Sequence, residues 1–360
     1  MRKNNMSIQE LLELTIKNKA SDLHLLVGIP PAIRVDGILN YLSNYPPLTG
    51  EAIEAMAFSI IKPHQKELLL ANKELDFSFG FGGGAYGNSG RFRVNLYFQR
   101  GYLSGAFRYL EPAIKTIEEL RLPKICNQFA NLRQGFILVT GPTGHGKSTT
   151  LAAIINEINQ TRSVHILTIE DPIEYVYPIA KSLVSQREMG QDSHSWAWAL
   201  RSALREDPDV VLIGEMRDPE TIASAITIAE TGHLVFSTLH TNSASQTIDR
   251  IIDSFPPTQQ PQIRIQLAST LKGLISQRLL PQINGGRVPA VEVLIGNNAI
   301  STNIREGKTH LIDSIIETSK EEGMISLESS LSELVMNGSI SLETAKNYAS
   351  HPNDLLRMVA

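Results

Sequence analysis

The amino-acid sequence predicts an α/β fold: a P-loop domain on a parallel sheet, with a smaller α+β domain before it and a helical region after it. The segment GPTGHGKST begins at residue 141, directly after the apolar run GFILVT. Further apolar runs alternate with helical stretches, which is typical of a parallel sheet covered on both faces. Residues before about 110 instead form short alternating runs broken by Gly and Pro, which are typical of antiparallel strands.

Composition narrows the class of protein. The 360 residues are 42% hydrophobic and 19% charged, enough for a large core and about two domains. The net charge of −4 lacks the basic excess of a nucleic-acid binder, so no direct nucleic-acid contact is expected. Cys126 is the single cysteine, which excludes a disulfide or a four-cysteine zinc site within one chain and fits a reducing cytosol. We expect no signal peptide and no transmembrane segment.

The N-terminal domain is predicted to cover residues 1–110. A helix over 7–19 begins with the capping pair Ser7 and Glu10, and a hairpin within 21–42 turns at 36–37. One helix is predicted over 50–71. Strands follow at 74–81, 90–99 and 105–110, with a Gly-rich loop at 82–90.

A polar linker with a short helix is predicted over 111–124, followed by the P-loop domain over 125–296. Its expected strands are 135–141, 164–170, 209–215 and 233–240, and a helix follows the first of them. The remaining region, 297–360, is predicted to be mostly helical.

The segment at 141 matches the pattern G-x-x-x-x-G-K-[ST] in full, between a predicted strand and a predicted helix. Such loops hold nucleotide phosphates with main-chain N–H groups, while the lysine reaches the β and γ phosphates and the hydroxyl takes a Mg²⁺ position. A chance Gly-rich turn is the alternative. The predicted cofactors are ATP and Mg²⁺, with Ser148 as a metal ligand, and the predicted nucleotide-binding residues are Gly141, Pro142, Thr143, Gly144, His145, Gly146, Lys147, Ser148 and Thr149.

Acidic residues follow two of the predicted strands, where α/β sheets bind ligands. Glu170, Asp171 and Glu174 follow one strand, and a carboxylate there could orient an attacking water. The alternative is an Asp-Pro turn with solvated acids. Glu215 ends DVVLIGE and resembles an acid that holds the Mg²⁺ shell. The alternative is that DVVLIGE is a plain core strand.

Histidines and arginines supply further candidates. His233 and His240 lie at the two ends of one predicted strand and could sense phosphate, although a lone histidine is usually structural, as expected for His24 and His194. Arg91, Arg93 and Arg108 lie outside the P-loop domain. They form either a solvated sheet face or arginine fingers from a neighbouring subunit, and spacing does not decide between the two.

Taken together, the motifs resemble the type II/IV secretion-ATPase superfamily, and most closely the type IV pilus retraction ATPases (the PilT/PilU family). The resemblance covers nearly the whole length, through ASDLHL, GRFRVN, the P-loop, ILTIEDPIEYVY, ALRSALREDPDVVLIGEMRDPETI and AETGHLVFSTLHT. It implies a PAS-like N-terminal domain, a RecA-like ATPase domain and a hexameric ring with ATP between subunits.

The resemblance also implies roles for single residues. The catalytic glutamate falls on Glu174 and the atypical Walker B acid on Glu215, which would hold Mg²⁺ through water. The arginine fingers match Arg93 and Arg108, and the His box gives His233 and His240. The sequence departs from the family pattern in three places: His145 replaces the usual Ser, Ser237 replaces the usual Gly, and residues 301–303 differ within AISTNIRE.

The predicted function is a hexameric ATPase motor that drives type IV pilus retraction and twitching motility. The expected location is the cytoplasm, at the inner membrane through the pilus machinery. Its expected partners are further copies of itself, a platform protein of the inner membrane and, as a further candidate, a paralogous pilus ATPase. Alternatives are a motor of a related type II/IV secretion or DNA-uptake system, a DNA translocase and a non-catalytic nucleotide-gated scaffold.

Overall fold

The computed structural model describes residues 6–35, 37–80, 90–110 and 113–359. The chain divides into two compact units. Unit 1 holds residues 1–113 together with 172–176, and unit 2 holds residues 114–171 and 177–360. In the described part of the chain, none of the helices combines the length and apolar character needed to cross a bilayer.

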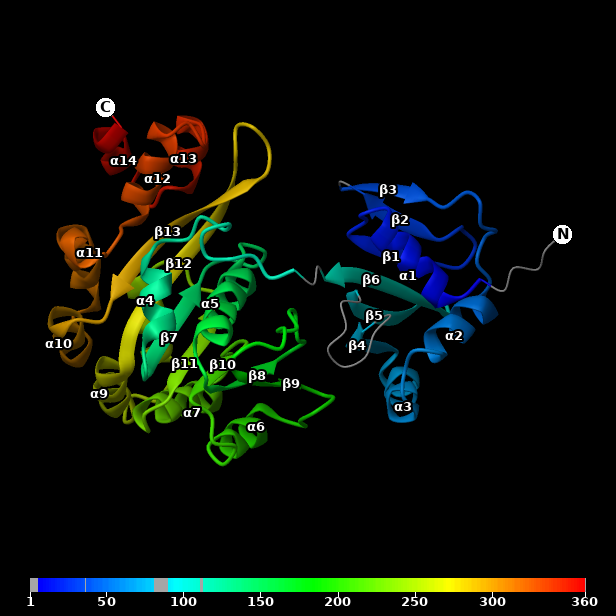
Figure 1. Ribbon diagram of the computed structural model, residues 1–360, viewed down its shortest axis with the longest axis horizontal. Helices are drawn as coiled ribbons and strands as arrows, with labels where there is room; N and C mark the ends of the chain where they lie inside the picture. Colours follow the sequence, from blue (N-terminus) through cyan, green and yellow to red (C-terminus); the bar gives the residue numbers. More distant parts are fainter. Residues whose placement is uncertain (1–5, 36, 81–89, 111–112, 360) are drawn as a thin grey trace. The chain divides into compact units, whose positions relative to one another are not determined.

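Unit 1 is an antiparallel sheet with three helices (Figure 1). The strand order is β3-β2-β1-β6-β5-β4. Alternate residues of β5, among them Phe92, Val94 and Leu96, are buried in the core, while Arg93 is exposed, as the alternating pattern predicts. The elements are α1 (Ile8–Lys17), β1 (Asp22–Leu25), β2 (Ala32–Val35), β3 (Ile38–Tyr41), α2 (Gly50–Phe58), α3 (Pro63–Asn72), β4 (Glu74–Gly80), β5 (Arg91–Gln99) and β6 (Tyr102–Leu110).

Two sequence predictions for this unit need correction. The helix predicted over 50–71 is two helices, because Pro63 has no N–H to donate and begins a new helix, α3. The segment 21–42, predicted as a hairpin, holds three strands, since β2 pairs with β1 on one side and with β3 on the other. Residues 82–89 of the predicted Gly-rich loop lie outside the described residues.

Unit 2 is a seven-stranded sheet in the order β13-β12-β7-β11-β10-β8-β9, parallel except for its antiparallel edge strand β13. The strands are β7 (Gly135–Thr140), β8 (His165–Glu170), β9 (Leu183–Glu188), β10 (Val210–Ile213), β11 (Leu234–Leu239), β12 (Leu271–Pro281) and β13 (Arg287–Ile295). The helices are α4 (Ile125–Asn131), α5 (Lys147–Thr161), α6 (Trp196–Ala203), α7 (Pro219–Glu230), α8 (Ala244–Asp253) and α9 (Gln260–Thr270).

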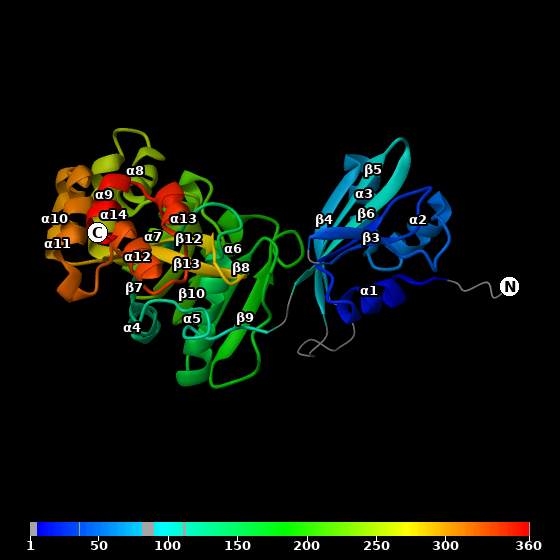
Figure 2. The same ribbon diagram turned by 90° about the horizontal axis from the view of Figure 1, so that it is seen from above.

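The sheet of unit 2 is covered on both faces, as its continuous apolar strands predict. Neighbouring residues of β7 belong to different cores: Phe136 and Leu138 pack with α7 and α9, whereas Ile137 and Val139 pack with α4 and α5. Figure 2 shows these two groups of helices on opposite sides of the strands. The predicted α/β fold class is therefore confirmed.

The chain after β11 holds the largest differences from the predicted elements. β12 and β13 form a long hairpin that was not predicted. Earlier in the chain, the described part of the linker, 113–124, has a turn at 117–121 in place of the expected short helix. The predicted helical C-terminal region is confirmed. It comprises α10 (Asn298–Glu306), α11 (Ile312–Thr318), α12 (Leu327–Met336), α13 (Leu342–Tyr348) and α14 (Pro352–Val359), joined by the short 3-10 helices Thr309–Leu311 and Lys320–Glu322.

The last three helices pack against this hairpin rather than on the centre of the sheet. Leu280 and Val288 of the hairpin share a small apolar cluster with Leu331 and Leu355. Figure 1 shows α12, α13 and α14 together beside one end of β12 and β13. The hairpin thus connects the P-loop sheet to the C-terminal helices.

Candidate nucleotide site

The P-loop lies between the carboxyl end of β7 and the start of α5. Gly141, Gly144 and Gly146 have φ angles of 139°, 78° and 83°, a region that side chains with a Cβ adopt only with strain. These angles turn the chain sharply from strand to helix. α5 follows the loop directly. Because the first N–H groups of a helix have no acceptor within that helix and its N-terminal dipole end is positive, this position suits an anion.

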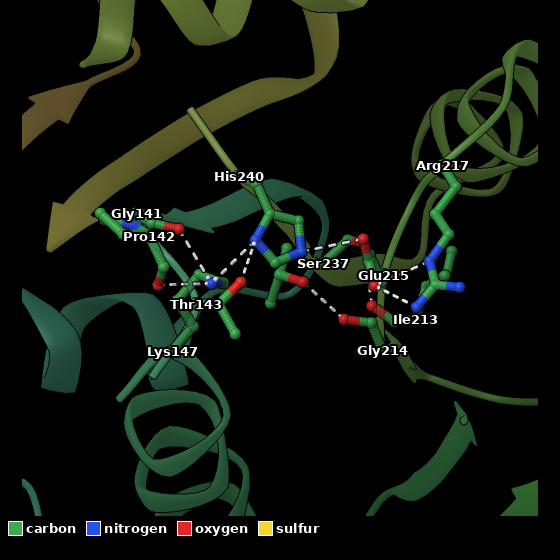
Figure 3. A network of polar contacts seen from close by, with 11 residues as sticks. Gly141, Pro142, Thr143, Lys147, Ile213, Gly214, Glu215, Arg217, Ser237 and His240 are labelled. Atoms are coloured by element: carbon green, nitrogen blue, oxygen red, sulfur yellow. Dashed lines mark hydrogen bonds and ion pairs between the residues drawn. The ribbon is translucent and has the colours of Figure 1, made fainter. Parts of the chain in front are cut away.

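Lys147 is the first residue of α5, and its side chain folds back over the loop. It is buried, and its Nζ donates to the carbonyl oxygens of Gly141 at 2.9 Å and Pro142 at 3.0 Å. The same Nζ lies 3.4 Å from Nδ1 of His240 (Figure 3). The ammonium group is therefore held against the loop that is predicted to bind phosphate.

Glu215 follows β10 and is connected to the P-loop through one histidine. His240 Nε2 lies 2.9 Å from Glu215 Oε1, while His240 Nδ1 lies 3.4 Å from Thr143 Oγ1. On its other side, Arg217 Nε donates to Glu215 Oε2 at 3.0 Å. Burial would raise the pKa of Glu215, but the hydrogen bond and charge of Arg217, together with His240, outweigh it and lower that pKa.

The two predicted histidines lie at opposite ends of β11. His240 follows the carboxyl end of the strand and joins the P-loop network (Figure 3). His233 precedes the amino end, where its Nδ1 lies 3.0 Å from Ile228 O and 3.0 Å from Thr231 Oγ1. A six-residue strand is about 20 Å long, so His233 is not part of the network around its own P-loop. Its predicted catalytic role stays a prediction.

Ser237, at a position where glycine is usual in the predicted family, fits the sheet without an unpaired hydroxyl. It is fully buried on β11, and its Oγ donates to Ile213 O of the neighbouring β10 at 2.8 Å. Thr238 Oγ1 donates to Gly214 O at 2.6 Å. These two bonds fix the end of β10, and with it the start of the segment that carries Glu215.

Arg93 and Arg108 face each other across β5 and β6 in unit 1. Like charges opposite each other on a sheet are destabilising, and each of these is compensated by an acid. Arg93 Nη2 lies 2.6 Å from Asp76 Oδ2, and Arg108 Nε lies 3.0 Å from Asp22 Oδ1. The two arginine side chains are about half or more exposed, at 47% and 69%.

Arg91 and Glu174 are connected through one short segment. Residues 172–176 group with unit 1, and Arg91 Nε donates to Ile173 O at 3.1 Å. Glu174, the predicted catalytic glutamate, is the exposed residue that follows Ile173. Arg91 also donates to Ser78 Oγ. Arg91 therefore holds the segment that carries Glu174.

The residues present fit a magnesium ion that is held mainly by phosphate and water. Among the described residues, no group of three or more His, Cys, Asp or Glu side chains could hold a metal alone. Mg²⁺ typically takes one or two protein oxygen ligands and completes its shell with phosphates and water. Ser148, in the first turn of α5, and Glu215, after β10, offer such hard oxygen atoms at one edge of the sheet.

Two side chains at the site were missed by the sequence analysis. Arg217 binds Glu215 from only two residues away, and its place in the run GEMRD was the available signal. Gln277 of β12 donates to His145 O at 2.7 Å, across 132 residues of sequence. No local pattern indicates such a contact.

Comparison with known proteins places the chain in a family. The model of the type II/IV secretion system protein family matches residues 117–346. The chain belongs to this family. It is 47% identical to the Pseudomonas aeruginosa type IV pilus retraction ATPase PilT, over 97% of this chain and 100% of that protein. It is 46% identical to a twitching motility protein of Neisseria gonorrhoeae, over 97% of this chain and 92% of that protein.

A solved structure extends the similarity to three dimensions. The crystal structure of the pilus retraction motor PilT with bound ADP superimposes with a TM-score of 0.91 at 48% identity, and covers 98% of this chain and 99% of that chain. The predicted membership of the retraction ATPases within the secretion family is therefore confirmed.

Proposed function

We propose that this secretion-family protein is an ATP-hydrolysing motor that drives type IV pilus retraction, and through it twitching motility. The observation that carries the proposal is similarity over the full length to PilT, both in sequence and in fold. The nucleotide in the PilT crystal structure is ADP, and the present chain has a complete P-loop. The polar network around Lys147 supports the same chemistry.

The network suggests how nucleotide binding would be communicated within unit 2. His240 Nδ1 is placed to accept from Lys147, while Nε2 is placed to donate to Glu215. An incoming phosphate would compete for the Lys147 ammonium, because a charge-assisted bond to phosphate is stronger than a long bond to imidazole. His240 would then be free to move with the phosphate and with Glu215.

Hydrolysis needs further groups around the nucleotide. When bound, Mg²⁺ would neutralise charge on the phosphates, with Ser148 and, through water, Glu215 as its protein ligands. We assign Glu174 to orienting and deprotonating the attacking water. Arg93 and Arg108 would stabilise charge on the transferring phosphoryl group from a neighbouring subunit of a homohexamer. Asp22 and Asp76 already hold these two guanidinium groups in place.

The proposed organisation follows from these roles. Residues 1–110 form the PAS-like domain that supplies the fingers, 111–124 a linker, 125–296 the RecA-like ATPase domain and 297–360 a helical C-terminal region. The motor would work in the cytoplasm, docked on an inner-membrane platform protein of the pilus machinery. A paralogous pilus ATPase is a further candidate partner.

A deletion strain tests the function directly. Loss of a retraction motor leaves pili that extend but do not shorten, so we expect hyperpiliated cells without twitching motility. Complementation with the wild-type gene, but not with a Lys147→Ala gene, should restore both phenotypes. Cells without pili would assign the motor to assembly instead, and unchanged piliation would favour a related secretion system.

The alternative of a related secretion system is retained because of one segment of α10. Residues 301–303 depart from the retraction-type motif, and Ser301 of α10 donates from Oγ to Ala268 O of α9 at 2.8 Å. Ile300 and Ile304 of the same helix remain buried. Ser301 is thus accommodated by a hydrogen bond to α9.

A further inference from the structure

The P-loop is bordered on one side by strand β12. β7 and β12 are paired in parallel up to Thr140 and Ser276, where β7 ends and the P-loop begins. β12 continues to Pro281, so Gln277 and the residues after it border the P-loop rather than a strand. Main-chain groups along this edge need other partners.

Gln277 holds the P-loop at two points. Its side chain is buried, its Nε2 donates to His145 O at 2.7 Å, and its Oε1 accepts from Thr150 Oγ1 at 2.7 Å. One amide therefore connects the tip of the loop with the first turn of α5. Gln277 and Thr150 are both buried, so an unpaired amide or hydroxyl group would be costly there.

His145 makes the third connection through its ring. Its Nδ1 accepts from the main-chain N–H of Leu279 at 3.0 Å. The ring must be neutral at Nδ1 to accept, and desolvation, followed by the positive charges of Lys147, Arg278 and Arg287, lowers its pKa and so favours that form. A serine at this position would be too short to span the same gap.

The loop glycines lie directly against the same strand. A Cβ on Gly141 would be 2.2 Å from Gln277 O, and a Cβ on Gly146 would be 2.9 Å from Gln277 Nε2. The glycines therefore serve the contact with β12 as well as the turn itself. A side chain at either glycine would therefore push the loop away from the strand.

We propose that Gln277, His145 and the main chain of Leu279 form a clip that holds the P-loop in its nucleotide-binding shape before nucleotide arrives. Gln277 and His145 are then positioning residues for nucleotide affinity. The proposal rests on the nucleotide site assigned above. Its physical basis is preorganisation: a loop that is already ordered does not lose that conformational freedom on binding.

The test compares matched variants in binding of a fluorescent ADP analogue to the assembled protein. His145→Phe keeps the ring but loses the acceptor, whereas His145→Asn places an amide oxygen at the same distance along the side chain as Nδ1. We expect His145→Phe to weaken binding about five- to tenfold, the effect of one net hydrogen bond, and His145→Asn to stay within about twofold of wild type. Gln277→Met should weaken binding by about tenfold or more.

Two further measurements separate positioning from general damage to the fold. In ATP turnover, the variants should raise KM more than they lower kcat, because saturating nucleotide restores the loop. Amide hydrogen exchange of residues 141–146 without nucleotide should be faster in His145→Phe than in His145→Asn. If His145→Phe does not fold, Thr150→Val removes one contact of Gln277 with little change in volume and should give the same pattern.

Failure of the clip can be distinguished from failure of the nucleotide site. Wild-type binding together with loss of binding in Lys147→Ala supports the site whatever the clip variants do. The clip is overturned if His145→Phe and Gln277→Met bind like wild type, or if His145→Asn is as weak as His145→Phe. It is also overturned if kcat alone falls.

Discussion

Single residues at the P-loop are held by the main chain of the loop itself. Lys147 is oriented by the carbonyl oxygens of Gly141 and Pro142, and His240 extends the same network to Glu215. Of these groups, the Lys147 cation suits a phosphate, whereas the Glu215 carboxylate suits a metal ion. The first three predictions concern these positions and the proposed water-activating acid.

Lys147→Ala should abolish ATP turnover. The ammonium is the one positive side chain that the structure places among the P-loop carbonyls at Gly141 and Pro142, and phosphate loses a charge-assisted bond without it. Steady-state phosphate release measures the effect, with the exposed Lys320→Ala as a matched control. Turnover near the wild-type rate would remove the basis of the P-loop assignment.

Gly141→Ala should damage nucleotide binding more than Gly144→Ala. Both glycines have positive φ, so each alanine is strained by about 1–2 kcal/mol. Only at Gly141 would the new Cβ also collide with Gln277 O, whereas nothing lies within 4 Å at Gly144. Equilibrium ADP binding and thermal unfolding compare the pair. Equal losses would mean that backbone strain alone accounts for the need for glycine.

Glu174→Gln should bind ATP but hydrolyse it very slowly, because an amide cannot accept the proton of the attacking water. Glu215→Gln is the matched variant, since it keeps the shape of an acid that is placed beside His240 and Arg217. Binding and turnover are measured separately for each. If only Glu215→Gln traps bound ATP, the roles of the two acids are reversed.

At the scale of elements, the sheet edge gathers residues that are far apart in the chain. β7, β10 and β11 end together and bring the P-loop, Glu215 and His240 to one place. The hairpin β12–β13 also positions a segment next to the site. Glu292 of β13 accepts from the N–H of Ala244, the first residue of α8, at 2.6 Å. It thereby fixes the segment that follows His240.

Stability should fall as pH rises from about 5 to 7, because of Glu292. Desolvation raises its pKa to about 7, aided by Asp313 and Glu328 and opposed by the Ala244 bond and Arg278. The folded state thus keeps a proton that the unfolded chain releases near 4.5, so stability is greatest below that pH and flat above about 7. The free energy of unfolding should fall by about 3 kcal/mol at most over this pH range.

Denaturant unfolding of wild type and Glu292→Gln between pH 5 and 8 measures this dependence. The amide does not titrate, so the variant should lose the slope that wild type shows in this range. Glu321→Gln, at an exposed position, serves as the control and should keep it. An unchanged slope in Glu292→Gln would assign the pH dependence to other groups.

At the scale of the whole molecule, the proposed fingers and the P-loop belong to different units of the chain. Arg93 and Arg108 lie in unit 1, while Lys147 and Glu215 lie in unit 2. If the fingers act on a neighbouring subunit, Arg93→Ala and Lys147→Ala should each be inactive alone. A finger in trans is worth about 10³–10⁵ in rate.

Mixing these two variants should restore part of the activity once their rings exchange subunits. Some interfaces would then combine an intact Arg93 with an intact Lys147. The rate should stay well below wild type, because the other interfaces remain inactive. Subunit exchange is checked with a labelled chain. Full activity of wild-type monomers kept apart by dilution would rule out an active site shared between subunits.

Local sequence patterns were enough to predict the P-loop, the burial of alternate residues on β5 and the continuous apolar strands of unit 2. They also carried the family resemblance. Each depends on residues close together in the chain, since turn geometry and strand or helix periodicity are local properties. The break at Pro63 was also local, but the periodic pattern on both sides concealed it.

The contacts that organise the site depend instead on how distant strands are aligned. The register of β12 against β7 brings Gln277 to His145, and the order of β10 and β11 brings His240 to Glu215 but leaves His233 at the other end. Antiparallel pairing of β5 and β6 sets Arg93 opposite Arg108. Register is a property of the packed sheet, because the burial of all its side chains selects it together.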